Sequence, residues 1–180
     1  MRKIIEQGVV TLDGVISTPQ EWVVPNWSGE YEAISRDLLF SVDALLYGRV
    51  SYEAHAQVWP GMEEGYGEYA VRMNSLPKHV ASRTLRETTW NATLIDGDVA
   101  EGVAKLKEQP GGTILKVGTG GELSRTLLEH RLVDEYLFWL FPTIAGGGER
   151  LYDGIPTTHL KLVDVKRIDS GILGLTYVPK

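Results

Sequence analysis

The chain has 180 residues, a formal net charge of −6, and apolar and charged fractions of 43% and 23% that are ordinary for a globular protein. It contains no cysteine, which excludes disulfides, thiolate metal sites and thiol nucleophiles. The negative charge argues against a general nucleic-acid surface, and no apolar run approaches the roughly 20 residues that span a bilayer.

The length and composition predict one domain over residues 1–180, because the chain has no repeat, no low-complexity tract and no long linker. Met1, Arg2 and Lys3 lead directly into two strand-like isoleucines, without the apolar core of a signal peptide. We therefore expect a cytoplasmic protein. The four histidines lack the spacing of a helical metal site, so we expect no metal.

The first half of the chain alternates between expected strands and helices. Met1 to Val10 forms a strand that Asp13 and Gly14 end in a turn, and Ser28 caps a helix with an apolar stripe at spacings of three and four. The elements that follow are a buried strand over 42–47, a helix from about Ser51, a helix over 65–75 stopped by Pro77, and strands over 78–81 and 90–95.

The second half continues the alternation and ends in a hairpin. Asp96 or Asp98 caps a helix that ends before Gly112, and a strand over 113–117 leads through glycines into an amphipathic helix. An aromatic strand follows over 135–141, then a hairpin over 160–168 and 172–178. This order predicts an α/β fold whose mostly parallel sheet has an antiparallel edge. Because the aromatic strand is apolar on both faces, one face is expected to meet the hairpin or a partner subunit, and we expect a homodimer.

Three buried strands run into helices through glycine, serine or arginine signals. Ligands of open α/β sheets lie beyond the carboxyl ends of the strands, where helix N-termini attract anions, so these junctions suggest a phosphate cradle. Each also has a plainer explanation, since such turns need a glycine and a cap, and a loop arginine is usually solvated. Neither the dinucleotide fingerprint nor a Walker lysine is present. The residues concerned are Gly48, Arg49 and Ser51; Ser82 and Arg83; and Gly118, Thr119, Gly120 and Gly121.

The order and spacing of several short segments resemble the dihydrofolate reductase superfamily over nearly the whole chain. The chain is most similar to stand-alone relatives of the reductase domain of the bifunctional riboflavin-biosynthesis deaminase/reductase. The resemblance implies a dihydrofolate-reductase-like three-layer fold and NADPH-dependent hydride transfer to a small heterocycle, pterin-like or pyrimidine-like. The segments that carry it are residues 11–14, 42–49, 76–84, 118–123, 132–135 and 142–148.

The same resemblance assigns roles along the cofactor. The adenosine phosphates, including the 2′-phosphate, would bind Gly48, Arg49, Ser51, Ser82 and Arg83. The pyrophosphate would bind Gly118, Thr119, Gly120 and Gly121 together with Glu122 and Leu123, and the backbone around Val9, Val10 and Ile16 would hold the nicotinamide carboxamide.

The substrate side is less determined. The riboflavin-pathway reductases usually carry a lysine directly after the Asp-Gly of the first turn, where this chain has Val15. Folate reductases place an acid on the first helix, and the resemblance makes Asp37, at the margin of the apolar stripe, the favoured candidate for the proton donor. Glu32 is the other candidate acid and a candidate substrate contact, because it fits by its distance from Gly48, although it also suits pairing with Arg36 four positions on.

Two further residues are candidate substrate contacts. Asp13 is one, although aspartate is a common turn former, and Trp27 is the other, although large aromatic residues are usually core. Two alternatives to a general heterocycle reductase stay open. One is the 5-amino-6-(5-phosphoribosylamino)uracil reductase of riboflavin synthesis, and the other is a non-catalytic nucleotide-binding or ligand-sensing protein.

Overall fold

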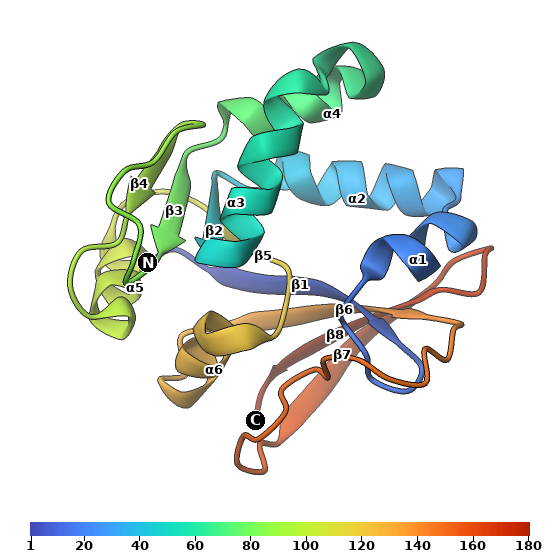
Figure 1. The fold of residues 1–180 in the computed structure, drawn as a ribbon. Helices are drawn as coiled ribbons and strands as arrows, with labels where there is room; N and C mark the ends of the chain where they lie inside the picture. The colour runs from blue at the N-terminus through green and yellow to red at the C-terminus, as the bar shows by residue number, and fades with distance from the viewer.

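In the computed structural model, which describes residues 1–180, eight strands form one sheet with helices on both faces (Figure 1). The sheet order is β4-β3-β2-β5-β1-β6-β8-β7. The first six strands in this order are parallel to one another, β8 is antiparallel to β6, and β7 at the edge is antiparallel to β8. The strands are β1 (Ile4–Thr11), β2 (Ala44–Gly48), β3 (Lys78–Ala81), β4 (Ala92–Leu94), β5 (Ile114–Val117), β6 (Glu135–Phe141), β7 (Leu160–Arg167) and β8 (Leu173–Pro179). The expected α/β architecture is confirmed.

Six α-helices cover the sheet, and two short 3-10 turns lie at Val24–Asn26 and Trp59–Gly61. The helices are α1 (Pro19–Val23), α2 (Gly29–Ser41), α3 (Arg49–Val58), α4 (Glu63–Ser75), α5 (Val99–Glu108) and α6 (Gly121–Glu129). None of them is long and apolar enough to cross a membrane.

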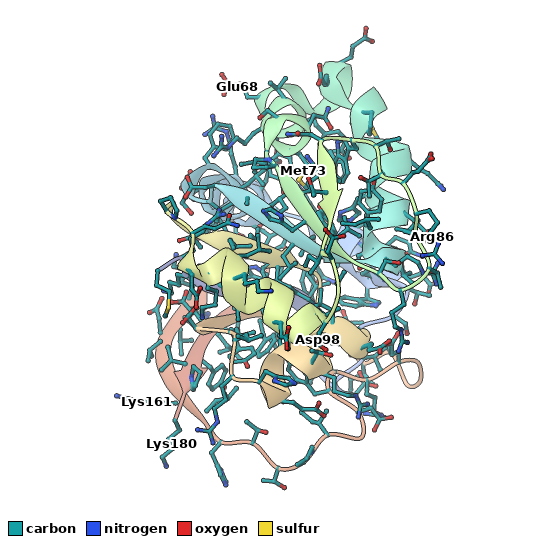
Figure 2. All side chains as sticks on the ribbon, turned by 90° about the vertical axis from the view of Figure 1, so that its left-hand side faces the viewer. Glu68, Met73, Arg86, Asp98, Lys161 and Lys180 are labelled. Atoms are coloured by element: carbon teal, nitrogen blue, oxygen red, sulfur yellow. The ribbon has the colours of Figure 1, made fainter.

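The buried side chains separate the layers. On one face, Val103 of α5 and Leu127 of α6 pack against the sheet, and on the other face Leu39 of α2 and Met73 of α4 do so. Figure 1 shows the same division, with α5 and α6 on one side and α1 to α4 on the other. In Figure 2, Glu68 of α4 lies at the outer surface, whereas Met73 of the same helix lies toward the sheet. The fold is therefore the three-layer arrangement that the resemblance implied.

The helix-capping predictions hold for two helices. The Ser28 hydroxyl accepts a hydrogen bond from the Tyr31 amide at the start of α2, and Asp98, one of the two residues proposed, accepts from the Glu101 amide at the start of α5.

Other boundaries differ from the predicted ones: the strands expected over 42–47 and 90–95 are β2 at Ala44–Gly48 and β4 at Ala92–Leu94, and α4 begins at Glu63 and not at Gly65. The third helix begins at Arg49 and not at Ser51, because β2 extends through Gly48 and the helix follows at once. The short helix α1 was missed, since five residues after a proline are too few to show a helical period.

The aromatic strand β6 is covered on both faces by its own chain. Tyr136 and Phe138 pack among side chains of the α5 and α6 face, while Trp139 and Phe141 pack in a cluster with Trp22 of α1. The hairpin lies beside the strand, since β8 pairs with β6 edge to edge. A partner subunit is thus not needed to cover β6, and the exposed apolar side chains lie instead on the edge strand β7, at Leu162, Val163 and Val165.

Candidate functional site

The three strand ends singled out in the sequence meet at one place. Strands β3, β2 and β5 are neighbours in the sheet and run parallel, so their carboxyl ends lie at the same edge. A cavity of about 340 Å³ lies there. Its lining residues are Gly48, Arg49, Val50, Ser51, Ala81, Ser82, Arg83, Thr84, Val99, Lys116, Thr119, Gly120, Gly121, Glu122, Leu123 and Thr126.

Two helix N-termini border the cavity. Helix α3 starts directly after Gly48 and α6 directly after Gly120, and no side chain caps either helix. Their first N–H groups therefore keep the partial positive charge of a helix start. Ser51, near which the sequence placed the start of this helix, is the third residue of α3. Its Oγ lies 3.6 Å from the position that a Cβ on Gly118 would take, so it faces the glycine loop.

Both predicted phosphate-binding arginines line the cavity, and each already holds a carboxylate. Arg49 Nη1 donates to Glu53 Oε2 at 2.8 Å within α3, and its side chain is 45% exposed. Arg83 Nη2 donates to Glu122 Oε2 at 2.8 Å, with side-chain exposures of 78% and 67%. Pairs this exposed contribute little stability, so the two guanidinium groups are available to another anion.

The serine beside Arg83 has a local structural role. The Ser82 hydroxyl accepts hydrogen bonds from the Thr84 and Leu85 amides at 3.2 and 3.0 Å and so shapes the turn that follows β3. This is the capped loop that the sequence offered as the plainer explanation. The hydroxyl hydrogen is not used in these two bonds, and Ser82 lines the cavity.

The glycine loop has the conformation that its composition predicts. Gly118, Gly120 and Gly121 have φ values of +74°, +81° and +70°, a region that favours glycine. A Cβ added at Gly121 would meet no atom within 4 Å, so the backbone is open on that side, whereas one at Gly120 would collide with Ile16. Leu123 is 7% exposed and packs into the core. An uncapped helix start beside exposed glycine backbone is a suitable cradle for a pyrophosphate.

None of the residues expected around the nicotinamide lines this cavity, and only Ile16 contacts a residue of its wall. Val10 is buried in the core on the α6 face, and Val9 packs on the other face beside the Trp22 cluster. Ile16 lies against Gly120, since an added Cβ there would be 2.2 Å from Ile16 Cδ1. The first turn and the glycine loop are therefore in contact through Ile16.

The Asp13 carboxylate has a structural role, because its oxygens are hydrogen-bonded within the fold. The carboxylate accepts hydrogen bonds from the Thr11 hydroxyl at 2.6 Å and from the Ala145 and Gly146 amides at 3.0 and 2.8 Å. The Thr11 hydroxyl, followed by the two amides, lowers the pKa of Asp13 to about 2. Asp13 thus fastens the first turn to the glycine-rich loop after β6.

The candidate acids and Trp27 lie away from the cavity. The rings of Trp27 and Tyr31 pack edge to face with their centroids 5.1 Å apart, and Trp27 Nε1 lies 3.4 Å from Glu32 Oε2. Asp37 is exposed on α2 and forms no hydrogen bond or ion pair. The structure does not bring Asp37, Glu32 or Trp27 to the cavity lining, so the proton donor stays a prediction.

A set of buried polar side chains beneath the glycine loop was not predicted from the sequence. Glu6 and Lys116 are paired residues on β1 and β5, and both are buried with Ser124 of α6. Burial lowers the pKa of Lys116, and the neighbouring Glu6 opposes that shift. Burial, reinforced by Glu6, raises the pKa of Tyr152 well above its usual range. The available signal was a charged residue within each of two otherwise apolar strands.

The comparisons with known proteins decide the family. The model of the RibD C-terminal domain matches residues 2–174. The chain belongs to this family. The chain is also similar to the uncharacterized protein YyaP of Bacillus subtilis (strain 168), with 32% identity over 182 residues, which cover 98% of this chain and 94% of that protein.

Solved structures share the fold of this RibD C-terminal domain. A protein of Shewanella sp. PV-4 named for riboflavin biosynthesis superposes with a TM-score of 0.75 at 21% identity, covering 99% of each chain. The diaminohydroxyphosphoribosylaminopyrimidine deaminase/5-amino-6-(5-phosphoribosylamino)uracil reductase of Thermotoga maritima gives 0.67 at 15% identity. In that match 99% of this chain covers 57% of the longer protein. The expectation of a relative of the RibD reductase domain is confirmed.

Proposed function

We propose that the protein is an NADPH-dependent reductase of a small heterocycle, pterin-like or pyrimidine-like. The observation that carries the proposal is the composition of the cavity wall. Two exposed cationic side chains, Arg49 and Arg83, and two uncapped helix starts border one cavity whose lining has a single acidic side chain, Glu122, while the third cation of the lining, Lys116, is buried beneath the glycine loop. That arrangement suits a ligand with several phosphates.

Different residues of the cavity wall would bind different parts of NADPH. Arg49 and Arg83 would bind the adenosine phosphates, with hydroxyls from Ser51 and Ser82 beside them. The open backbone at Gly121 and the free amides of α6 would bind the pyrophosphate. When bound, NADPH supplies the hydride.

The nicotinamide end would lie beyond the glycine loop. The contact of Ile16 with Gly120 joins that loop to the first turn, so a ligand leaving the cavity along the loop would pass the carboxyl end of β1. Backbone groups around Val9, Val10 and Ile16 would orient the carboxamide there. The domain's contribution is orientation, since the cofactor carries the redox chemistry.

One feature favours an uncharged heterocycle over a phosphoribosyl substrate. Val15, at the position where a lysine was expected for a phosphoribosyl substrate, is an apolar side chain only 1% exposed. The family match and the name of the Thermotoga neighbour support the phosphoribosylaminouracil as the second candidate. The exposed position of Asp37 supports the non-catalytic alternative, because no candidate acid approaches the cavity.

The proposal is tested by binding and turnover measured on the same preparation. Calorimetric titration with NADPH and NADH is followed by cofactor oxidation with a panel of pterins, pyrimidines, phosphoribosylated pyrimidines, quinones and imines. We expect NADPH to bind and one heterocycle to support its oxidation. Binding without any oxidation would favour the non-catalytic alternative, and turnover confined to the phosphoribosylated pyrimidine would favour the second candidate. Absence of NADPH binding would refute the proposal.

A further inference from the structure

A buried cluster of charged and polar side chains lies directly beneath the glycine loop. Glu6 of β1, Lys116 of β5 and Ser124 of α6 have exposures of 0%, 3% and 0%. Glu6 and Lys116 are register partners on neighbouring strands, so their side chains leave the sheet on the same face, the one that α6 covers. We call these three residues the Glu6–Lys116 cluster.

The cluster holds the loop at two successive residues. Lys116 Nζ donates to the Gly118 carbonyl at 2.8 Å, and the Thr119 hydroxyl donates to Glu6 Oε1 at 2.8 Å. The same Glu6 oxygen accepts from the Ser124 hydroxyl at 2.6 Å, which fixes the first turn of α6, and it lies 3.4 Å from Lys116 Nζ. The loop and the helix start therefore have one common anchor in the sheet.

Stability alone does not account for such a cluster. Two charges are removed from water, and apolar side chains of similar volume at such sites often give an equally stable fold. One oxygen of the cluster, Glu6 Oε2, is buried without any hydrogen-bond partner, which adds to the cost of burial.

The loop, in contrast, needs external support. Three glycines in the left-handed region give it few side chains with which to fix its own shape, and glycine loses the most conformational freedom on folding. The β1 backbone also packs tightly below, since a Cβ at Gly8 would be 2.3 Å from Thr119 Cγ2. Anchored in this way, the loop is preorganised for a ligand.

We propose that the Glu6–Lys116 cluster is the positioning device of the pyrophosphate-binding loop, which it holds through Gly118 and Thr119. The proposal rests on the function proposed above. Lys116 acts through the loop and not on the 2′-phosphate, so its contribution is common to every ligand that carries a pyrophosphate. Arg83, by contrast, would distinguish NADPH from NADH.

The experiment replaces both charges together, as Glu6→Met with Lys116→Met, because removing one alone would leave the other buried and unpaired. The matched control is Asp134→Asn with Lys107→Met. It removes another ion pair, of 2.7 Å, between α5 and the segment before β6, where the Lys107 side chain is 8% exposed. Circular dichroism and urea unfolding establish that both variants are folded.

We expect the cluster variant to bind NADPH, NADH and ADP more weakly by one common factor, at least about 10-fold, because the loop is no longer preorganised. Adenosine 2′-monophosphate, which has no pyrophosphate, should bind within twofold of the parent protein. The control should match the parent for all four ligands. Equal loss for adenosine 2′-monophosphate, or no loss for any ligand, would overturn the proposal.

A second measurement separates this proposal from the proposed function. Amide hydrogen exchange in the free protein should be at least about 10-fold faster over residues 118–123 in the cluster variant, with α5 unchanged. If the parent protein binds no dinucleotide, the proposed function fails, but the exchange result still decides whether the cluster positions the loop. Unchanged exchange over those residues would refute the positioning role.

Discussion

Arg83→Ala is expected to weaken NADPH binding while leaving NADH binding almost unchanged, because only NADPH carries the 2′-phosphate. A charge-assisted hydrogen bond to phosphate contributes about 1.5–3 kcal/mol. Arg83 must first release Glu122, and an ion pair this exposed, with 78% and 67% of the side chains accessible, is worth about 0.2–1 kcal/mol. The difference, about 0.5–2.8 kcal/mol, corresponds to a loss of roughly 2- to 100-fold in NADPH affinity.

The assay is calorimetric titration of both cofactors into the parent protein, Arg83→Ala and two comparison variants. Arg86→Ala removes the same charge from an exposed residue outside the cavity lining, and it should leave both affinities unchanged. Gly121→Val should weaken both cofactors, because its side chain would enter the open space beside the shared pyrophosphate cradle. Equal affinity of the parent for the two cofactors, or an equal loss for both in Arg83→Ala, would remove Arg83 from 2′-phosphate recognition.

Four further outcomes are expected. Glu122→Gln should tighten NADPH by roughly 1.5- to 5-fold in the same titration, because it frees the arginine from an exposed ion pair, and a weaker complex would contradict this. Asp13 has a pKa lowered from 3.8 to about 2, so its stabilising contribution is complete above pH 3.8 and is lost as the pH falls through about 2. The stability difference between the parent and Asp13→Asn in urea unfolding should therefore shrink over that interval, and a constant difference would argue against the carboxylate bonds. Gly174→Ala should destabilise by about 1–3 kcal/mol, since its Cβ would lie 2.5 Å from the Trp139 ring, and an unchanged unfolding midpoint would show that the ring moves freely. Light scattering should give about twice the 20.0 kDa chain mass, and Val163→Lys on the exposed strand β7 should give the single-chain mass, whereas a parent mass near 20.0 kDa would refute the dimer.

The order of the helices and strands could be predicted from the sequence, because apolar periodicity, caps and turn residues mark most of them clearly. Strands β3 and β6 have the predicted bounds, and Ser28 and Asp98 cap the helices as expected. Errors fell where a boundary depends on how neighbouring elements meet. Helix α2 runs to Ser41, so the residues just after it are a connection and not the start of β2.

The site was predictable in part for the same reason. Parallel strands bring their carboxyl ends together, so glycine, serine and arginine signals after three buried strands were enough to gather the cavity wall. The strand order, which places β5 beside β2, could not be obtained from one sequence. The direction of Asp37 was also beyond sequence reasoning, because a residue at the margin of a helical stripe turns inward or outward with the packing of that helix.

The pairing of charges explains how a chain with net charge −6 can hold a site for an anion. Each cation of the cavity wall already has a carboxylate: Arg49 has Glu53, Arg83 has Glu122 and Lys116 has Glu6. The two arginine pairs are exposed and weak, so a phosphate can replace their carboxylates, whereas the lysine pair is buried and fixed. A lone phosphate gains little by displacing one glutamate. A ligand whose separate phosphates reach both arginines and the glycine loop adds several of these small binding free energies in one binding event. This arrangement favours a dinucleotide over a free phosphate.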